Sequence, residues 1–153
     1  MLDAEIVDKP KVKDPVLALQ GELGKLPQVD LQTAHLTHGG MYARTIFIPA
    51  GVALTGAKTN IANICIVSGD ITVSTDTGVV RLTGYHVIPA NAGFRRAGFA
   101  HADTYWTTLL HTEMDDLQAI EDAMTDQSAT LQTRTLAISS DKTIKVNLCH
   151  SQQ

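Results

Sequence analysis

The sequence predicts a mostly β protein, an antiparallel barrel or sandwich followed by one helix. From Met41 onward the chain divides into short apolar runs separated by glycine, proline and polar residues, a pattern typical of such folds. After the last run, acidic residues precede apolar residues at helical spacing. With 153 residues, the chain has room for one compact domain and short tails.

The composition is that of an ordinary globular protein. Hydrophobic residues make up 44% and charged residues 18%, and the net charge of -4 leaves no basic face for nucleic acid. The N-terminus lacks the basic start and apolar run of a signal peptide, and no window approaches the roughly 20 apolar residues of a membrane span. Cys65 and Cys149 show neither zinc-site nor disulfide spacing, so a reducing compartment is the simpler assumption.

Residues 1–37 are predicted to form an N-terminal arm. Its charged stretch from Lys9 to Pro15 is interrupted by prolines and is not expected inside a sheet. Residues 16–26 predict a short helix, because valine and leucines lie partly on one face, although Gly21 and Gly24 weaken it.

The barrel strands follow from local patterns. Residues 41–48 alternate, which predicts one buried face, and residues 61–67 are nearly all apolar and β-branched, which predicts burial on both faces. Ser68 to Asp70 are expected to turn the chain. Residues 71–75 and 79–82 flank a loop containing Gly78 and predict a hairpin. Further strands are predicted over 86–88 and 104–111.

One helix is predicted after the barrel, capped by Thr112 with Asp115 at its third position. Its apolar stripe is expected to pack on the barrel or on a neighbouring subunit, and consists of Met114, Leu117, Ile120 and Met124. The adjacent acids Asp115 and Asp116, and Glu121 and Asp122, are expected on a solvated face. Residues 125–135 read as a linker, and two short strands are predicted over 135–138 and 143–148, pairing within the chain or with a neighbour.

The segment from Tyr42 to Gly56, with Pro49 and Gly51 in its turn, resembles small single-domain cupin-like proteins found in phage and bacterial genomes. The resemblance continues through residues 67–69 and 104–108 into the acidic helix, and covers residues 38–124. It implies a cupin-like, jelly-roll type antiparallel barrel. The arm over 1–37 and the C-terminal linker and strands over 125–153 lie outside it.

Cupins hold a metal with histidines and a glutamate from two motifs, and the resemblance places those motifs between Gly51 and Gly69 and between Gly84 and Gly98. The first block contains no histidine, and the ligand positions hold Thr59, Asn63 and Arg96. A guanidinium keeps its proton and offers no lone pair to a metal. We therefore expect no metal and no other cofactor.

The remaining reactive residues form no catalytic pattern. His35 and His38 are expected to be surface or loop residues, and the other barrel histidines are scattered. Cys65 lies in an apolar strand, where burial would leave it inert. No catalytic residue is predicted.

The block between Gly84 and Gly98 also contains candidate ligand-binding residues. They are Arg96, which the resemblance places facing the former metal cavity, and Tyr85 and His86. Arg96 could bind a carboxylate or phosphate, or pair internally with Asp103. Of Tyr105 and Trp106, one is expected in the core and the other outside, at an interface.

Two functions are predicted. The first is a non-catalytic structural or interaction module, an oligomeric phage virion component such as a head-decoration or tail-accessory protein. Its partners would be further copies and other assembly proteins, and its interface candidates are Trp106, Met114, Leu117 and Met124. The second is a small-molecule-binding or metal-dependent cupin enzyme acting on a sugar or organic acid. The location expected is the virion for a phage protein and otherwise the bacterial cytoplasm, with no nucleic-acid or membrane partner.

Overall fold

The computed structural model describes residues 15–75 and 77–135. Helix α1 (Pro15–Leu23) precedes a seven-stranded sheet, and α2 (Leu117–Met124), the single 3-10 turn η1 (Ser128–Thr130) and α3 (Gln132–Thr135) follow it. The strands are β1 (Thr33–His38), β2 (Met41–Ile48), β3 (Ala53–Thr55), β4 (Asn63–Thr75), β5 (Gly78–Ala90), β6 (Ala97–Ala100) and β7 (Thr104–His111). The predicted mostly β fold class is confirmed. Of the strands predicted over 135–138 and 143–148, only Thr135 is described, and it ends α3; the rest, and the first 14 residues of the arm, lie outside the described residues.

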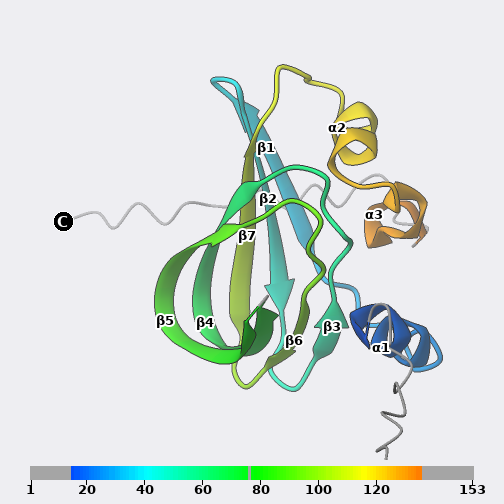
Figure 1. Ribbon diagram of the computed structural model, residues 1–153, viewed down its shortest axis with the longest axis vertical. Helices are drawn as coiled ribbons and strands as arrows, with labels where there is room; N and C mark the ends of the chain where they lie inside the picture. The colour runs from blue at the N-terminus through cyan, green and yellow to red at the C-terminus, as the bar shows by residue number, and fades with distance from the viewer. Residues whose placement is uncertain (1–14, 76, 136–153) are drawn as a thin grey trace, which may run out of the picture.

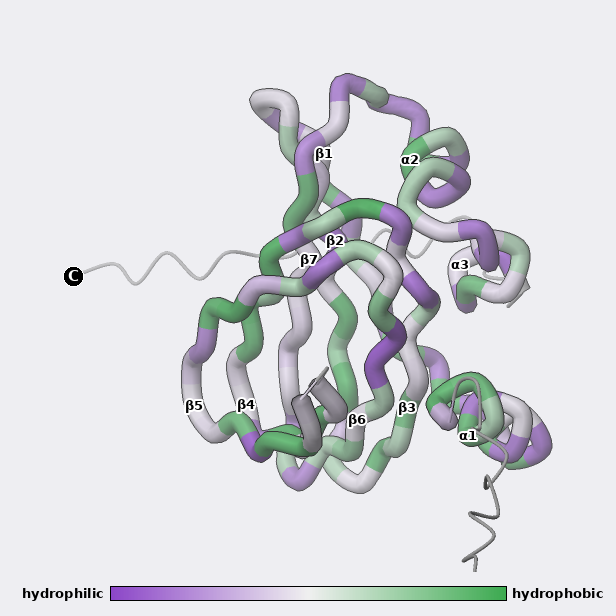
Figure 2. The backbone as a smooth tube through the Cα atoms, viewed as in Figure 1, coloured by the Kyte–Doolittle hydropathy of each residue, from purple (hydrophilic) through white to green (hydrophobic). Residues whose placement is uncertain are grey.

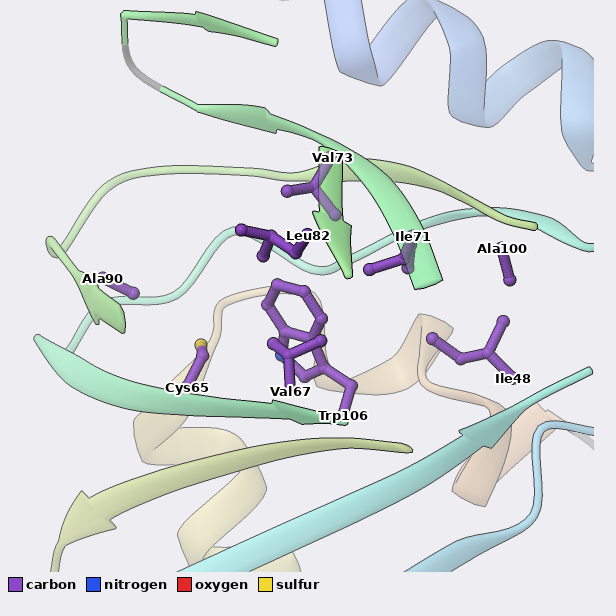
Figure 3. Packing of buried hydrophobic residues seen from close by; sticks show 9 residues of the cluster. All are labelled: Ile48, Cys65, Val67, Ile71, Val73, Leu82, Ala90, Ala100 and Trp106. Carbon is purple, nitrogen blue, oxygen red and sulfur yellow. The ribbon is translucent and has the colours of Figure 1, made fainter. Parts of the chain in front are cut away.

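All strand pairs are antiparallel, in the order β1-β2-β7-β4-β6-β3, with β5 paired to β4. The sheet curls into a half-barrel, and the three helices stand along one side of it (Figure 1). Side chains from both halves of the curl meet in the interior, where Trp106 and Val67 point toward Leu82 and Val73 (Figure 3). This apolar interior is the main core, because it removes aromatic and aliphatic surface from water.

The β4–β5 hairpin is longer than predicted and bends in its middle. The predicted turn at residues 68–70 is wrong, because β4 runs through it and Gly69 pairs with Gly84 of β5. Before the bend β4 pairs with β7, and after it with β6. The predicted burial of residues 61–67 on both faces is also wrong: Cys65 and Val67 are buried, whereas Ile64 is 45% exposed, since the described residues leave the convex face uncovered.

The strand β1 was not predicted. Residues 33–38 pair with β2 through a two-residue turn at Gly39 and Gly40, whose φ angles are 58° and 74°. Such positive φ values at both turn positions match the right-handed twist of the flanking strands. His35 and His38 therefore lie in a strand and not in a loop, and both are exposed, as the surface alternative predicted.

The helix after the barrel begins later than predicted. Asp116 is its N-cap and accepts a hydrogen bond from the Ala119 N–H at 3.0 Å, whereas the Thr112 hydroxyl accepts from the Met114 N–H in the preceding loop. That loop between β7 and α2 is largely hydrophilic (Figure 2). Helix α2 packs Ile120 and Met124 against the inward side chains of β2 and β7, forming a second apolar cluster. Residues 125–135 are not a linker, since η1 and α3 occupy most of them.

The N-terminal helix α1 forms close to its predicted position but ends at Leu23, and it contains no buried residue. Within the described part of the chain, no helix has both the length and the apolar character needed to cross a membrane.

Gly69 is the position where a side chain is least tolerable. A Cβ there would lie 2.7 Å from the Thr104 Cα and 2.8 Å from the Asp103 carbonyl oxygen, and its φ of 150° is unfavourable for other residues. We expect Gly69→Ala to lower the free energy of unfolding in urea by about 2–4 kcal/mol, through overpacking and backbone strain together.

Gly84→Ala is the matched control across the hairpin. Gly84 also has a positive φ, 86°, but a Cβ added there would have no atom within 4 Å, so only backbone strain of about 1–2 kcal/mol applies. Equal losses in the two variants would contradict the close contact at Gly69.

Candidate functional site

The concave side of the sheet encloses a cavity of about 670 Å³, within the usual range for small-molecule sites. Strands β2, β4 and β7 supply one wall, and β3, β6 and the loop before β6 supply another. Most of the lining is apolar, including Ile48, Leu54 and Trp106. The charged side chains in the lining are Arg44 and Arg96, so the cavity is positive in character.

Thr59, Asn63 and Arg96, the residues expected at the cupin ligand positions, all line this one cavity. Asn63 donates to the Ile61 carbonyl at 3.0 Å and accepts from the Cys65 thiol at 3.4 Å. Burial raises the pKa of the Cys65 thiol, which keeps it protonated and a poor nucleophile. The predicted burial of Cys65 is confirmed.

Arg96 lies near two aromatic rings in the cavity wall. Its guanidinium carbon is 5.3 Å from the centre of the Phe94 ring and 5.7 Å from that of Trp106, within cation–π range. Its hydrogen bonds, at 3.4 and 3.3 Å, go to the carbonyl oxygens of Ser74 and Pro89. The expected alternative partner, Asp103, instead accepts from the Ala50 N–H. In the described structure no carboxylate lies within ion-pair distance of Arg96.

The other two ligand-binding candidates do not join Arg96. Tyr85 is 68% exposed and points outward from β5. His86 lies opposite Val67 and its Nε2 is 2.8 Å from the Thr83 carbonyl oxygen, and neither residue lines the cavity. Alternation along β5 explains the outward position of Tyr85 only, because His86 shares the inward register of Val67 and contacts the Thr83 carbonyl oxygen.

The predicted interface residues are also divided by the fold. Trp106 and Met124 are buried in the chain's own two apolar clusters, so they are not available to a partner. Leu117 packs against the second cluster, and Met114 alone of the four is exposed, at 47%. Trp106 takes the inward position of the aromatic pair and Tyr105 the outward one.

A buried ionic cluster closes the side of the cavity next to the helices, and the sequence patterns did not predict it. Glu121 was expected on a solvated face, which is wrong, because it is 2% exposed. Its carboxylate accepts from the Thr133 hydroxyl at 2.6 Å and from Arg44 and Arg134 at 3.4 Å each. The available signal was Arg44 itself, a charged residue at an inward position of an alternating strand, which requires a buried partner.

Beside this cluster, His35 Nδ1 and the Tyr42 hydroxyl lie 2.7 Å apart. Burial, reinforced by the charge of Arg44, lowers the pKa of His35. Burial is also the largest cause that raises the pKa of Tyr42, to about 12. Both side chains are therefore neutral near pH 7, and they share a hydrogen bond without adding charge to the cluster.

The acidic and metal-binding side chains of residues 15–75 and 77–135 do not converge: among them there is no group of three or more His, Cys, Asp or Glu that could hold a metal ion. The charged groups in the lining of the cavity are guanidiniums, which can form paired hydrogen bonds with a carboxylate or phosphate.

Solved structures with a similar backbone include cupin-domain proteins. KdgF from Halomonas sp. is 15% identical over 61% of this chain and 90% of its own, with a TM-score of 0.48. A cupin superfamily protein from Desulfitobacterium hafniense is 10% identical over 58% and 84%, with a TM-score of 0.47. The cupin domain of Schizosaccharomyces pombe Cnp3 is 20% identical over 58% and 71%, with a TM-score of 0.44.

These similarities concern the shape of the backbone alone and not its chemistry. No family model matches the chain, and no curated protein matches it.

The ionic cluster predicts that removing Glu121 and removing its neighbour Asp122 lower the stability of the protein by different amounts. Glu121→Ala leaves two arginines facing an empty site, and we expect the free energy of unfolding in urea to fall by about 3–5 kcal/mol. Asp122→Ala removes an ion pair with Arg134. The Asp122 side chain is 60% exposed and its charge is screened by solvent, so the expected loss of unfolding free energy is only a small fraction of that for Glu121→Ala. Similar losses in both variants would contradict the burial of the Glu121 pair.

The raised pKa of Tyr42 predicts that the protein loses stability at alkaline pH. Between pH 10 and about 12, the unfolded chain releases this proton while the folded chain keeps it, so the free energy of unfolding should fall as the pH rises. The loss would be about 2 kcal/mol at pH 11.5 and would approach roughly 3 kcal/mol only above pH 12, since one pKa unit corresponds to about 1.4 kcal/mol. Urea unfolding at pH 8.5 and 11.5 measures it. Tyr42→Phe should flatten the difference and the exposed control Tyr85→Phe should not; an unchanged slope in Tyr42→Phe would refute this assignment.

Proposed function

We propose that this domain binds a small organic anion in its cavity, with Arg96 holding the anionic group. This selects the small-molecule role among the predicted functions and takes an organic acid as the ligand class. The observation that carries it is the position of Arg96, which lines the cavity without a carboxylate partner in the described part of the chain.

The contrast with the other cavity arginine supports this assignment. Arg44 faces the Glu121 carboxylate, so part of its charge is already compensated. Arg96 has only long hydrogen bonds to two carbonyls, although a guanidinium has five N–H donors. A ligand carboxylate or phosphate would satisfy the remaining donors and could do so with two parallel hydrogen bonds.

The aromatic neighbours of Arg96 suit the rest of such a ligand. The Arg96 guanidinium lies within cation–π distance of both Phe94 and Trp106, and these two contacts limit its motion before binding. The aliphatic lining beyond them, including Leu54 and Val73, would contact the carbon skeleton of the ligand. The geometry therefore favours a compact acid with an apolar or weakly polar body over a highly charged one.

Trp106 provides the assay, because it is the single tryptophan of the chain and lines the cavity. Fluorescence titration with benzoate, succinate, citrate and glucuronate should identify at least one acid that changes its emission. Arg96→Gln should weaken that binding by about 10- to 100-fold, since a hydrogen bond to a charged group contributes about 1.5–3 kcal/mol.

Two controls make the titration specific. Arg81→Gln removes an arginine that pairs with Asp70 outside the cavity, and its affinity should stay within about twofold of wild type. The neutral amide of the binding acid should bind at least about tenfold more weakly than the acid itself. Failure of all four acids to alter the emission, or equal binding by Arg96→Gln, would reject the proposal.

The assembly role predicted from the sequence is the second candidate. An uncovered apolar sheet face favours a protein contact, as developed below, whereas the virion part of that prediction rests on the sequence resemblance alone. The two candidates are compatible, because the cavity and the sheet face lie on opposite sides of the same strands.

A further inference from the structure

The convex side of the sheet carries a neutral, largely apolar surface, interrupted by Thr45, Ser68 and Thr107, which we call the open face. Strand register places Tyr105 opposite Phe47 on one side and Ser68 on the other, and Ser68 lies opposite Tyr85. These residues form one outward row across β2, β7, β4 and β5. The rings of Phe47 and Tyr105 are in contact, with centroids 5.1 Å apart.

The next rows continue the same character. Ile66 lies opposite Val87 and Thr107, and Ile64 lies opposite Pro89 and Leu109. Ile64, Tyr85, Val87 and Tyr105 are each exposed by 45% or more. Exposed apolar residues scattered singly are ordinary, but a contiguous patch of this kind usually marks an interaction site.

The open face has no charge of its own. Its outward positions from the Ile64 row to the Ser68 row contain no Asp, Glu, Lys or Arg on β2, β4, β5 or β7. Along β4 and β5 the first charges are Asp70, one row farther along, and Arg81, two rows farther along, which binds Asp70 with two hydrogen bonds of 2.7 and 2.8 Å. That pair neutralises itself, so a strongly acidic or basic partner would find no complementary charge here.

The extent of the face matches a dimer contact. Strand β1 adds the exposed Leu36, opposite Ala43 of β2, to the same side of the sheet. Five strands about 4.8 Å apart, with three outward positions about 6.8 Å apart, cover on the order of 500 Å² in projection. Because side chains protrude from the sheet, the solvent-accessible area of this face exceeds its projected area and comes closer to the roughly 800 Å² per partner of a stable interface.

We propose that a second copy of this chain covers the open face, so that two sheets pack face to face about a two-fold axis. A neutral apolar face is complementary to itself, because the two-fold operation brings no like charges together. Two such sheets would pack about 10 Å apart and remove the exposed tyrosines and aliphatic side chains from water. The prediction of a homo-oligomer is thereby kept, with its interface moved from Trp106 and Met124 to the open face.

Sedimentation velocity of the full chain over about 1–100 µM tests this proposal. The wild-type protein should sediment as a dimer of twice 16.4 kDa. Tyr105→Lys and Val87→Lys, on different strands, should each weaken dimerisation at least about 100-fold, because each buries an unpaired ammonium at the contact. Met114→Lys introduces the same charge at an exposed apolar residue before α2 and should leave the dimer unchanged.

Far-UV circular dichroism and the emission of Trp106 establish that each variant remains folded. A monomeric wild-type chain at the highest concentration would overturn the proposal and assign the face to another segment of the same chain or to a different protein. Dissociation by Met114→Lys, with Tyr105→Lys and Val87→Lys still dimeric, would overturn it as well. Neither result bears on anion binding, which the Arg96 titration tests separately.

Discussion

The curvature of the sheet depends on the close approach of Gly69 to the backbone at Asp103 and Thr104. Because Gly69 has no side chain, β4 can leave its partner β7 there and continue as the partner of β6. Hydrogen bonds hold the corner: the Asp70 N–H donates to the Thr104 hydroxyl at 3.1 Å, and the Asp70 carbonyl accepts from the His101 N–H at 2.8 Å. A straight β4–β5 hairpin would not bring Val73 and Leu82 over Trp106, and it would enclose no cavity.

Once the sheet is curled, its concave side must satisfy every charge that it buries. On the side near the helices, Glu121 receives Arg44, Arg134 and Thr133, so two guanidiniums share one carboxylate. In the barrel interior Arg96 is held by aromatic rings and carbonyl oxygens instead. The charge of Arg44 is thus compensated within the fold, whereas in the proposed anion site a ligand would compensate the charge of Arg96. This difference is the physical basis of the proposal.

Strand alternation gives the two faces of the sheet separate chemistry. Inward residues of β4 such as Cys65 and Val67 belong to the core, and their outward neighbours Ile64 and Ile66 belong to the open face. A change on one face therefore leaves the other largely intact. Ligand binding and self-association can be carried by the same strands without competing for the same side chains.

Local patterns in the chain were enough to establish the fold class, the strands over 41–48 and 104–111, the hairpin around Gly78 and the burial of Cys65, because these depend on alternation and turn residues. The family resemblance also grouped Thr59, Asn63 and Arg96, which line one cavity. Packing between distant segments set the remaining features. It turned residues 68–70 into a bend, capped α2 with Asp116, and buried Glu121 between Arg44 of β2 and the side chains of α3. Those outcomes depend on contacts between segments far apart in the chain, such as Gly69 with Thr104 and Arg44 with Glu121, which no local pattern encodes.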